Sequence, residues 1–298
     1  MPRIAYVNGQ YVPHHAAGVA IEDRGYQFAD GVYEVIAIAG GEVVDMDPHM
    51  ARLKNSLAGL EINLPISEAA LRMAMLRVAR LNRVQFGILY LQISRGVAPR
   101  DHAWAEGLRP SLVMTCRSVP MGKMAALAEK GVSVKTMPED RWARPDIKTI
   151  SLLPNVLAKQ AARSGGDYEA WFVDGDGYVT EGASTNAWIV EGDGTLVTRP
   201  LSRAILPGIA RSILLEVAAR DGIPVREEAF TPEQAKGARE AFITSTGGLV
   251  PVTAIDGDVV ANGAPGGLSL QLAAAYQQHM ADQTANPEAT MRGLQGQA

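Results

Sequence analysis

Short hairpin signals interleaved with helical patterns constrain the fold of this chain more than any other feature of its sequence. Asn-Gly at 8–9 separates two short apolar runs, and Gly-Gly at 40–41 turns the longer run "GVYEVIAIAGGEVVDM" back on itself. Amphipathic helical segments lie between such signals, one opening with Asp47 as its N-cap and one running from Ser67 to about Leu81. Strands so dispersed do not fit a simple βαβ repeat. The pattern therefore predicts an α+β protein with mixed sheets and flanking helices.

The length of the chain, 298 residues, is sufficient for two domains of ordinary size. Pro120 and Gly122 interrupt the patterns in "VPMGKMAAL", so this segment is interpreted as a linker. We expect an N-terminal α+β domain over 1–121 and a C-terminal domain over 122–280. The C-terminal stretch "QQHMADQTANPEATMRGLQGQA" is polar and has no apolar periodicity, and residues 281–298 are expected to form a disordered tail.

The second half of the chain repeats the mixture of strands and helices. A helix is expected from Asn155 to about Arg163, followed by three strands within "YEAWFVDGDGYVTEGASTNAWIVEGDGTLVT". In "LPGIARSILLEVAARDG", Ile209, Ile213 and Val217 recur on one face of a helix that Gly222 would end.

Composition excludes several classes of function. The net charge of −4 and the absence of a basic run argue against a nucleic-acid partner. Cys116 is the single cysteine, so an internal disulfide is impossible, no metal site is expected, and a reducing compartment fits best. The N-terminus lacks the apolar core of a signal peptide, and arginines interrupt the most apolar helical run, "AALRMAMLRVARL". We expect no membrane span and a cytoplasmic protein.

A lysine in an apolar segment raises the question of function. In "WARPDIKTISLLPNVLAKQ", Lys148 follows Ile147 and precedes Ile150, so an extended chain would carry an ammonium group through apolar surroundings. Three explanations compete: a solvated lysine on an edge segment, a buried salt-bridge partner, or an amine used in chemistry. An apolar setting favours the neutral amine, which can bond covalently to the carbonyl of a substrate or of pyridoxal phosphate.

Pyridoxal phosphate would need further groups, and the sequence has a candidate for each. Gly208 begins a well-formed helix whose first amides could face a phosphate. The run "TSTGG" at 244–248 ends a strand with three hydroxyls, Glu181 precedes a glycine at a strand turn, and Arg52 lies on the first long helix. Each feature alone also fits a structural role, respectively a helix cap, a turn, a solvated acid and a surface arginine.

Six ordered stretches together resemble the fold type IV pyridoxal-phosphate enzymes, and most closely the D-amino acid aminotransferases. They are "EDRGYQFADGVYEV", "ISRGVAPRDH", "RWARPDIKTISLLPNVLAKQ", "VTEGASTN", "LPGIAR" and "FITST". The resemblance runs from about residue 4 to residue 256. It implies a two-domain fold type IV architecture and pyridoxal 5'-phosphate as cofactor.

The resemblance also implies roles for individual residues. Lys148 matches the lysine that holds the cofactor and moves the proton, and Glu181 matches the acid that pairs with the pyridine nitrogen. Arg52 matches the arginine on the phosphate. The other implied cofactor-binding positions are Ser184, Leu206, Ile209, Ala210, Ser245 and Thr246. The chain departs from the family at Ala210 and Gly247, where threonines are expected, and at Ala183, where a serine is usual. A missing hydroxyl at Ala210 leaves its backbone amide intact, so weaker cofactor retention is expected rather than loss of binding.

Substrate residues must separate the activities within the family. Arg100 and His102 in "APRDH", together with Tyr33, resemble the family's trap for the substrate α-carboxylate. The resemblance implies a homodimer in which Arg100 and His102 serve the neighbouring subunit. It favours transamination between a D-amino acid, such as D-alanine or D-glutamate, and a 2-oxo acid, such as 2-oxoglutarate or pyruvate. The alternatives are an (R)-amine or branched-chain L-amino acid transaminase, aminodeoxychorismate lyase, and a non-catalytic protein that retains the fold.

Overall fold

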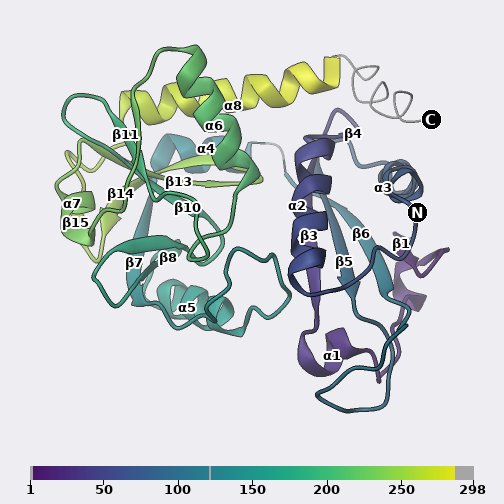
Figure 1. The fold of residues 1–298 in the computed structure, drawn as a ribbon. Helices are drawn as coiled ribbons and strands as arrows, with labels where there is room; N and C mark the ends of the chain where they lie inside the picture. Colours follow the sequence, from purple (N-terminus) through teal and green to yellow (C-terminus); the bar gives the residue numbers. More distant parts are fainter. Residues whose placement is uncertain (1–2, 121, 286–298) are drawn as a thin grey trace. The chain divides into compact units, whose positions relative to one another are not determined.

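The structure, a computed structural model, describes residues 3–120 and 122–285. Contacts within the chain divide these residues into two compact units (Figure 1). The first unit contains 3–120, 147–151 and 280–285, and the second contains 122–146 and 152–279. A single boundary near residue 122 was expected, so the return of 147–151 to the first unit is a difference. It arises because this segment pairs with the backbone of Gly31 and its neighbours.

The first unit is built on a six-stranded antiparallel sheet in the order β2-β1-β6-β5-β3-β4. Its strands are β1 (Ile4–Val7), β2 (Gln10–Pro13), β3 (Gly31–Ala39), β4 (Glu42–Val43), β5 (Gly87–Ser94) and β6 (Ser111–Ser118). Both predicted hairpins are confirmed, with Val7 opposite Gln10 and Ala39 opposite Glu42.

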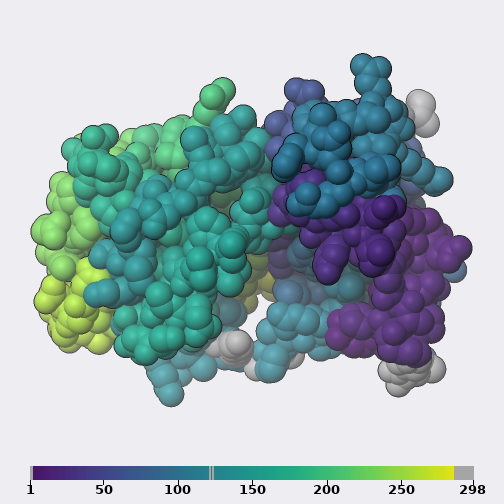
Figure 2. Space-filling view, turned by 90° about the horizontal axis from the view of Figure 1, so that it is seen from below, coloured from purple at the N-terminus to yellow at the C-terminus, as the bar shows by residue number. Residues whose placement is uncertain are grey.

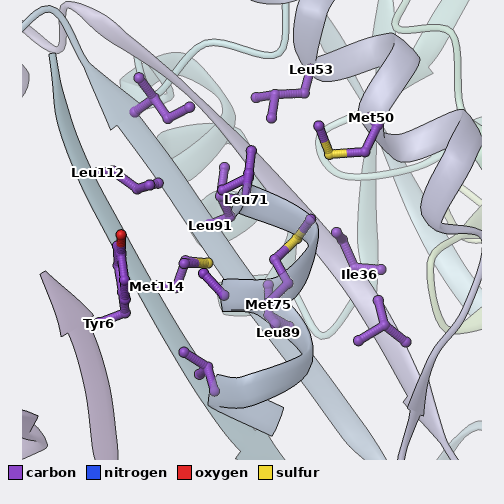
Figure 3. Close-up of a cluster of buried hydrophobic side chains, with 14 of the residues drawn as sticks. Tyr6, Ile36, Met50, Leu53, Leu71, Met75, Leu89, Leu91, Leu112 and Met114 are labelled. Atoms are coloured by element: carbon purple, nitrogen blue, oxygen red, sulfur yellow. The ribbon is translucent and has the colours of Figure 1, made fainter. Parts of the chain in front are cut away.

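Two long helices, α2 (Met46–Gly59) and α3 (Glu68–Asn82), cover the sheet of the first unit. The unit also contains the short helix α1 (Arg24–Phe28) and the 3-10 turn η1 (His14–Ala16). Figure 3 shows Met50 of α2 and Met75 of α3 among the buried side chains of the sheet. Ser67 caps α3 as predicted. The predicted cap of α2 is wrong: Asp45 precedes the helix and Asp47 lies in its first turn, where its charge favours the positive end of the helix dipole.

The second unit has a nine-stranded mixed sheet in the order β12-β11-β10-β13-β14-β7-β8-β9, with β15 paired to β14. Its strands are β7 (Val132–Pro138), β8 (Glu169–Val173), β9 (Val179–Gly182), β10 (Asn186–Val190), β11 (Leu196–Thr198), β12 (Val225–Glu227), β13 (Glu240–Ser245), β14 (Gly248–Ile255) and β15 (Asp258–Val259). Four strands, rather than the predicted three, lie between 168 and 198. A tight turn separates β9 from β10, and in this turn the amide of Gly182 donates to the carbonyl of Thr185.

The helices of the second unit correct two expectations. They are α4 (Lys123–Lys130), α5 (Leu153–Ser164), α6 (Ile209–Arg220), α7 (Pro232–Lys236) and the larger part of α8 (Gly267–Ala285), whose residues 280–285 belong to the first unit. The expected linker contains α4, because "KMAALAEK" consists of good helix formers after the breaker Gly122. The polar stretch from Gln277 is helical as far as Ala285, so the prediction of disorder is wrong there. The backbone amide of Asp45 donates to Oε1 of Gln283, and Nε2 of Gln283 donates to the carboxylate of Asp45. Residues 286–298 lie outside the described residues.

Candidate active site

Lys148 lies in the first unit on an extended segment that runs antiparallel to the start of β3. The amide of Tyr33 donates to the carbonyl of Lys148 at 2.9 Å, and the amide of Lys148 donates to Oγ of Ser56 at 3.1 Å. Ile147 is buried in the core and fixes the segment from the other side. The lysine Nζ lies 4.4 Å from the centroid of the Tyr33 ring, a cation–π distance. The backbone of Lys148 is therefore anchored, and its amine faces an aromatic ring.

Arg52 belongs to a buried network on the other face of β3. Because side chains alternate along a strand, Glu34 points away from the face of Tyr33 and toward α2. Nε and Nη2 of Arg52 donate to the two carboxylate oxygens of Glu34 at 2.9 and 2.6 Å, and Nδ1 of His49 lies 2.7 Å from the same carboxylate. Burial alone would raise the pKa of Glu34, but the contacts with Arg52 and His49 lower it to about 2. The guanidinium of Arg52 is thus oriented by a partner that is ionised at neutral pH.

Arg100 and His102 lie on the exposed loop between β5 and β6. Their side chains meet at one aromatic ring: Cζ of Arg100 lies 5.0 Å from the centroid of Phe28, and the ring of His102 lies 5.5 Å from it. The three expected carboxylate ligands therefore fall into two groups. Tyr33 is placed with Lys148, and the loop pair is placed around Phe28.

Glu181 lies in the second unit on β9 and is fully enclosed by polar partners. Nη1 of Arg141 donates to one carboxylate oxygen at 2.6 Å, while Nδ2 of Asn186 and the amide of Leu206 donate to the other, each at 3.0 Å. Burial raises the pKa of Glu181 to about 7, even though Arg141 acts in the opposite direction. The protonation of this carboxylate therefore responds strongly to any additional cation or proton donor beside it.

Arg141 is a site residue to which the sequence reasoning gave no role. Its guanidinium also binds both oxygens of Glu139, at 2.8 and 2.6 Å, and lies 4.5 Å from the ring centroid of Phe172. The signal that could have found it is physical: a buried carboxylate requires a cation or a set of donors. The sequence does not say which arginine, because the two residues are forty positions apart.

Asn186 joins Glu181 to the start of α6. Its Nδ2 donates to the carbonyl of Leu206 at 3.0 Å as well as to Glu181. A Cβ on Gly208 would overlap with Oδ1 of Asn186, so glycine is required for this close approach. Among the described residues no side chain caps α6, which leaves the first amides of the helix, beginning with Ile209, directed outward at its N-terminus.

The end of β13 lies beside the same asparagine. Thr244 pairs with Asn186 across the sheet, Ser245 ends the strand, and Thr246 comes next in the chain. The structure therefore places Glu181, the start of α6 and the end of β13 around Asn186, and these elements carry six of the expected residues. They are Glu181, Leu206, Ile209, Ala210, Ser245 and Thr246.

Two further expected positions have structural explanations. The hydroxyl of Ser184 donates to the fully buried Glu169 at 2.6 Å, and Nζ of Lys159 lies 2.8 Å from the other oxygen of that carboxylate. Gly247 stands where a threonine was expected. A Cβ at this position would approach Met124 of α4 to between 3.2 and 3.4 Å, so the methionine takes up the space of a larger residue.

The residue types present fit pyridoxal phosphate. An uncapped helix N-terminus near two hydroxyl residues suits a phosphate group. The enclosed carboxylate of Glu181 suits a protonated ring nitrogen, and the amine of Lys148, on its anchored backbone, suits an aldehyde. Among residues 3–120 and 122–285, no cluster of three or more potential metal-ligating side chains occurs. Within the same part of the chain, every helix is too short or too polar to cross a bilayer.

Comparison with known proteins defines the class. The family model "Amino-transferase class IV" matches residues 31–255, and the chain belongs to this family of pyridoxal-phosphate-dependent aminotransferases. The expected fold type IV architecture is therefore confirmed, as are the enzyme class and the cofactor.

Individual relatives refine the comparison. The chain is 40% identical to a D-alanine aminotransferase of Bacillus licheniformis over 93% of this chain and 97% of the relative. It is 38% identical to a D-alanine aminotransferase of Listeria innocua over 89% and 92% of the two chains. The solved structure of a branched-chain amino acid aminotransferase from Escherichia coli superposes with a TM-score of 0.84 over 94% and 95% of the chains. Its identity of 24% shows the shared fold alone.

Proposed function

We propose that this aminotransferase transfers the amino group of a D-amino acid, D-alanine, D-glutamate or a close relative, to 2-oxoglutarate or pyruvate. The observation that carries the choice of an amino acid over a simple amine is the pair Arg100 and His102, gathered on one exposed loop around Phe28. A guanidinium beside an imidazole suits a carboxylate. The likeness to two D-alanine aminotransferases supports the D-configuration.

The chain's own residues divide the work. Bound pyridoxal phosphate supplies an electron sink for the substrate Cα–H bond. Lys148 would hold the cofactor through its amine and would move the proton that leaves the substrate Cα. Glu181 keeps the ring nitrogen protonated, and Arg141, with Asn186, holds Glu181 in place.

A second group of residues holds the phosphate and the ring in this proposal. Arg52 supplies a cation, and the α6 N-terminus supplies amides. The residues assigned to these contacts are Ser184, Leu206, Ile209, Ala210, Ser245 and Thr246. In the structure the hydroxyl of Ser184 donates to Glu169, so Ser184 would donate to the cofactor only by giving up that bond.

A homodimer is part of the proposal. Arg100 and His102 would serve the active site of the neighbouring subunit, while Tyr33 and Lys148 serve their own. Exposed apolar side chains support self-association: Leu153, Val156 and Leu157 of α5 recur at helical spacing and are 57–67% exposed. We also propose a cytoplasmic location, with which the free thiol of Cys116 agrees.

One assay panel tests the proposed substrate. Purified protein is given D-alanine with 2-oxoglutarate, L-leucine with 2-oxoglutarate, and (R)-1-phenylethylamine with pyruvate. The proposal predicts the highest kcat/KM for D-alanine. Preference for L-leucine would favour the branched-chain alternative. Pyruvate release from aminodeoxychorismate without an acceptor would indicate the lyase.

A further inference from the structure

The loop that carries Arg100 and His102 has no helix or strand of its own between β5 and β6, yet it is firmly attached to the segment around α1. Figures 1 and 2 show the two segments side by side. The amide of Arg24 donates to the carbonyl of Gly96 at 2.8 Å, and the amide of Ala98 donates to the carbonyl of Glu22 at 3.2 Å. These bonds fix the base of the loop and leave its tip to be held by side chains.

The side chain of Arg24 holds the backbone of the loop tip. Its Nη1 donates to the carbonyl of Asp101 at 2.6 Å, and its Nη2 donates to the carbonyl of His102 at 3.0 Å. A longer contact of 3.4 Å reaches the carbonyl of Ala103. Arg24 is only 3% exposed, although it is charged. Three successive carbonyls are therefore bound by one planar guanidinium, a geometry that a lysine cannot reproduce.

Asp30 holds Arg24 and a second arginine in position. Its carboxylate accepts from Nε of Arg24 at 2.8 Å and from Nε and Nη2 of Arg95 at 2.8 and 3.0 Å. Burial alone would raise the pKa of Asp30, but the hydrogen bonds from Arg95 and Arg24 lower it below its ordinary value. Cζ of Arg95 lies 3.8 Å from the ring centroid of Trp104, so the loop is also held beyond its tip.

Phe28, the last residue of α1, organises the side chains of the loop tip. Its ring centroid lies 4.8 Å from Cζ of Arg24, 5.0 Å from Cζ of Arg100 and 5.5 Å from the ring of His102. One aromatic ring thus contacts both the arginine that binds the loop backbone and the two side chains that the loop presents.

We propose that Arg24 and Phe28 are positioning residues for substrate binding: Arg24 fixes the loop backbone at 101–103, and Phe28 orients Arg100 and His102 toward the α-carboxylate. The inference rests on the proposed role of Arg100 and His102. Ordering the loop before binding removes an entropic cost that each substrate would otherwise bear. Neither Arg24 nor Phe28 contacts the substrate.

The first test replaces Arg24 by lysine, which keeps the charge and loses the planar set of donors. Hydrogen exchange of the amides at 98–106 should become faster, and KM for D-alanine should rise about tenfold with little change in kcat. The rate with (R)-1-phenylethylamine, which has no carboxylate, should not fall. The matched control is Arg72→Lys on α3, which removes a guanidinium that binds Glu68 of α3 and Asp47 of α2. This control should leave loop exchange and KM unchanged.

The second test replaces Phe28 by leucine. Arg24 binds carbonyl groups of the backbone, so loop exchange should remain as in the wild type, while KM for D-alanine rises. A rise in KM without faster hydrogen exchange in the loop would not result from general destabilisation. If Arg24→Lys fails to fold, Phe28→Leu still tests the proposed orientation of Arg100 and His102.

Arg100→Ala provides the reference for both tests. If this variant binds D-alanine as well as the wild type does, the proposed carboxylate site is wrong, and the positioning role is wrong with it. If Arg100→Ala raises KM while both Arg24→Lys and Phe28→Leu retain the wild-type KM, the carboxylate site stands and the positioning role is overturned.

Discussion

At the scale of single residues, this protein buries charged groups in small, closed networks. Glu181 is paired with Arg141, Glu34 with Arg52, and Asp30 with two arginines. Each network satisfies a carboxylate that would otherwise be costly to bury. Such networks give a side chain one defined orientation, which a catalytic site requires.

Glu181→Gln tests the charge at the proposed ring-nitrogen position. The variant should fold and retain the cofactor, because Arg141 keeps both oxygens of Glu139 as partners. Turnover of D-alanine should fall by about 10²-fold, since a preorganised charge is lost. Steady-state kinetics measure turnover, and absorbance of the purified protein measures cofactor content. Unchanged kcat would remove Glu181 from this role.

Glu34→Gln tests the buried network behind β3. The folded-state pKa of Glu34, about 2, lies below its ordinary value of 4.5, so its contribution to stability is fully present above pH 4.5 and is lost as the pH falls toward 2. At pH 7 the variant should be less stable by about 3–5 kcal/mol, because Arg52 loses its buried partner. Urea unfolding of both proteins between pH 7 and pH 3 should show the difference shrinking below pH 4.5. A difference that stays constant with pH would contradict the assignment.

The sequence identifies some site residues and not others for a definite reason. Lys148 is a candidate because a charge in an apolar segment is locally visible, whereas Glu181, which adjoins a glycine at a strand turn, becomes a candidate through the resemblance. The roles of Arg141 and Arg24 were not predicted. Their partners lie about forty and eighty positions away, and only the folded chain brings them together.

At the scale of elements, Asn186 of β10 connects β9 to the start of α6. The amide of Asn186 bonds both Glu181 and the carbonyl of Leu206, and its oxygen occupies the space beside Gly208. Gly208, which in the sequence resembles an ordinary helix start, is therefore required because no larger residue fits beside Asn186.

Gly208→Ala should disturb this element junction. The new methyl group would displace Asn186, weaken cofactor retention and lower stability by about 1–3 kcal/mol. Gly192→Ala is a matched control in the same unit, because an added Cβ there meets nothing within 4 Å. Thermal unfolding and the absorbance remaining after dialysis measure the two effects. Equal behaviour of the two variants would show that the close contact is unimportant.

Elements with local signals were predictable, and those that depend on distant partners were not. The hairpins of the first unit and the helix after Ser67 follow turn and capping chemistry. The end of α8 was missed because its polar face gains stability from a partner far away in sequence, through the bonds of Gln283 to Asp45. The helix α4 was missed because Pro120 and Gly122 dominated the interpretation of a short helical run.

At the scale of the whole molecule, the segment 147–151 is the part of the fold that the sequence did not indicate. It interrupts the second unit and packs with the first, so Lys148 is carried by one unit and Glu181 by the other. Contiguous patterns along the chain predict contiguous domains, and an excursion of so few residues leaves no such pattern.

Mixed dimers test the proposed assembly. Lys148→Ala chains, which lack the amine, are combined with Arg100→Ala chains, which lack the carboxylate ligand. If Arg100 serves the neighbouring subunit, one of the two sites regains both residues, and part of the wild-type D-alanine activity should return. No recovery, despite demonstrated subunit exchange, would mean that Arg100 serves its own subunit or does not bind substrate.

The central claim is that Lys148, fixed by Tyr33 and Ser56, is the residue that holds pyridoxal phosphate. The most direct measurement is reduction of the cofactor-loaded protein with borohydride, followed by proteolysis and mass spectrometry of the labelled peptides. A single label on Lys148, absent from Lys148→Ala, is the predicted result. A label on another lysine of the wild-type protein, with Lys148 unmodified, would contradict the claim.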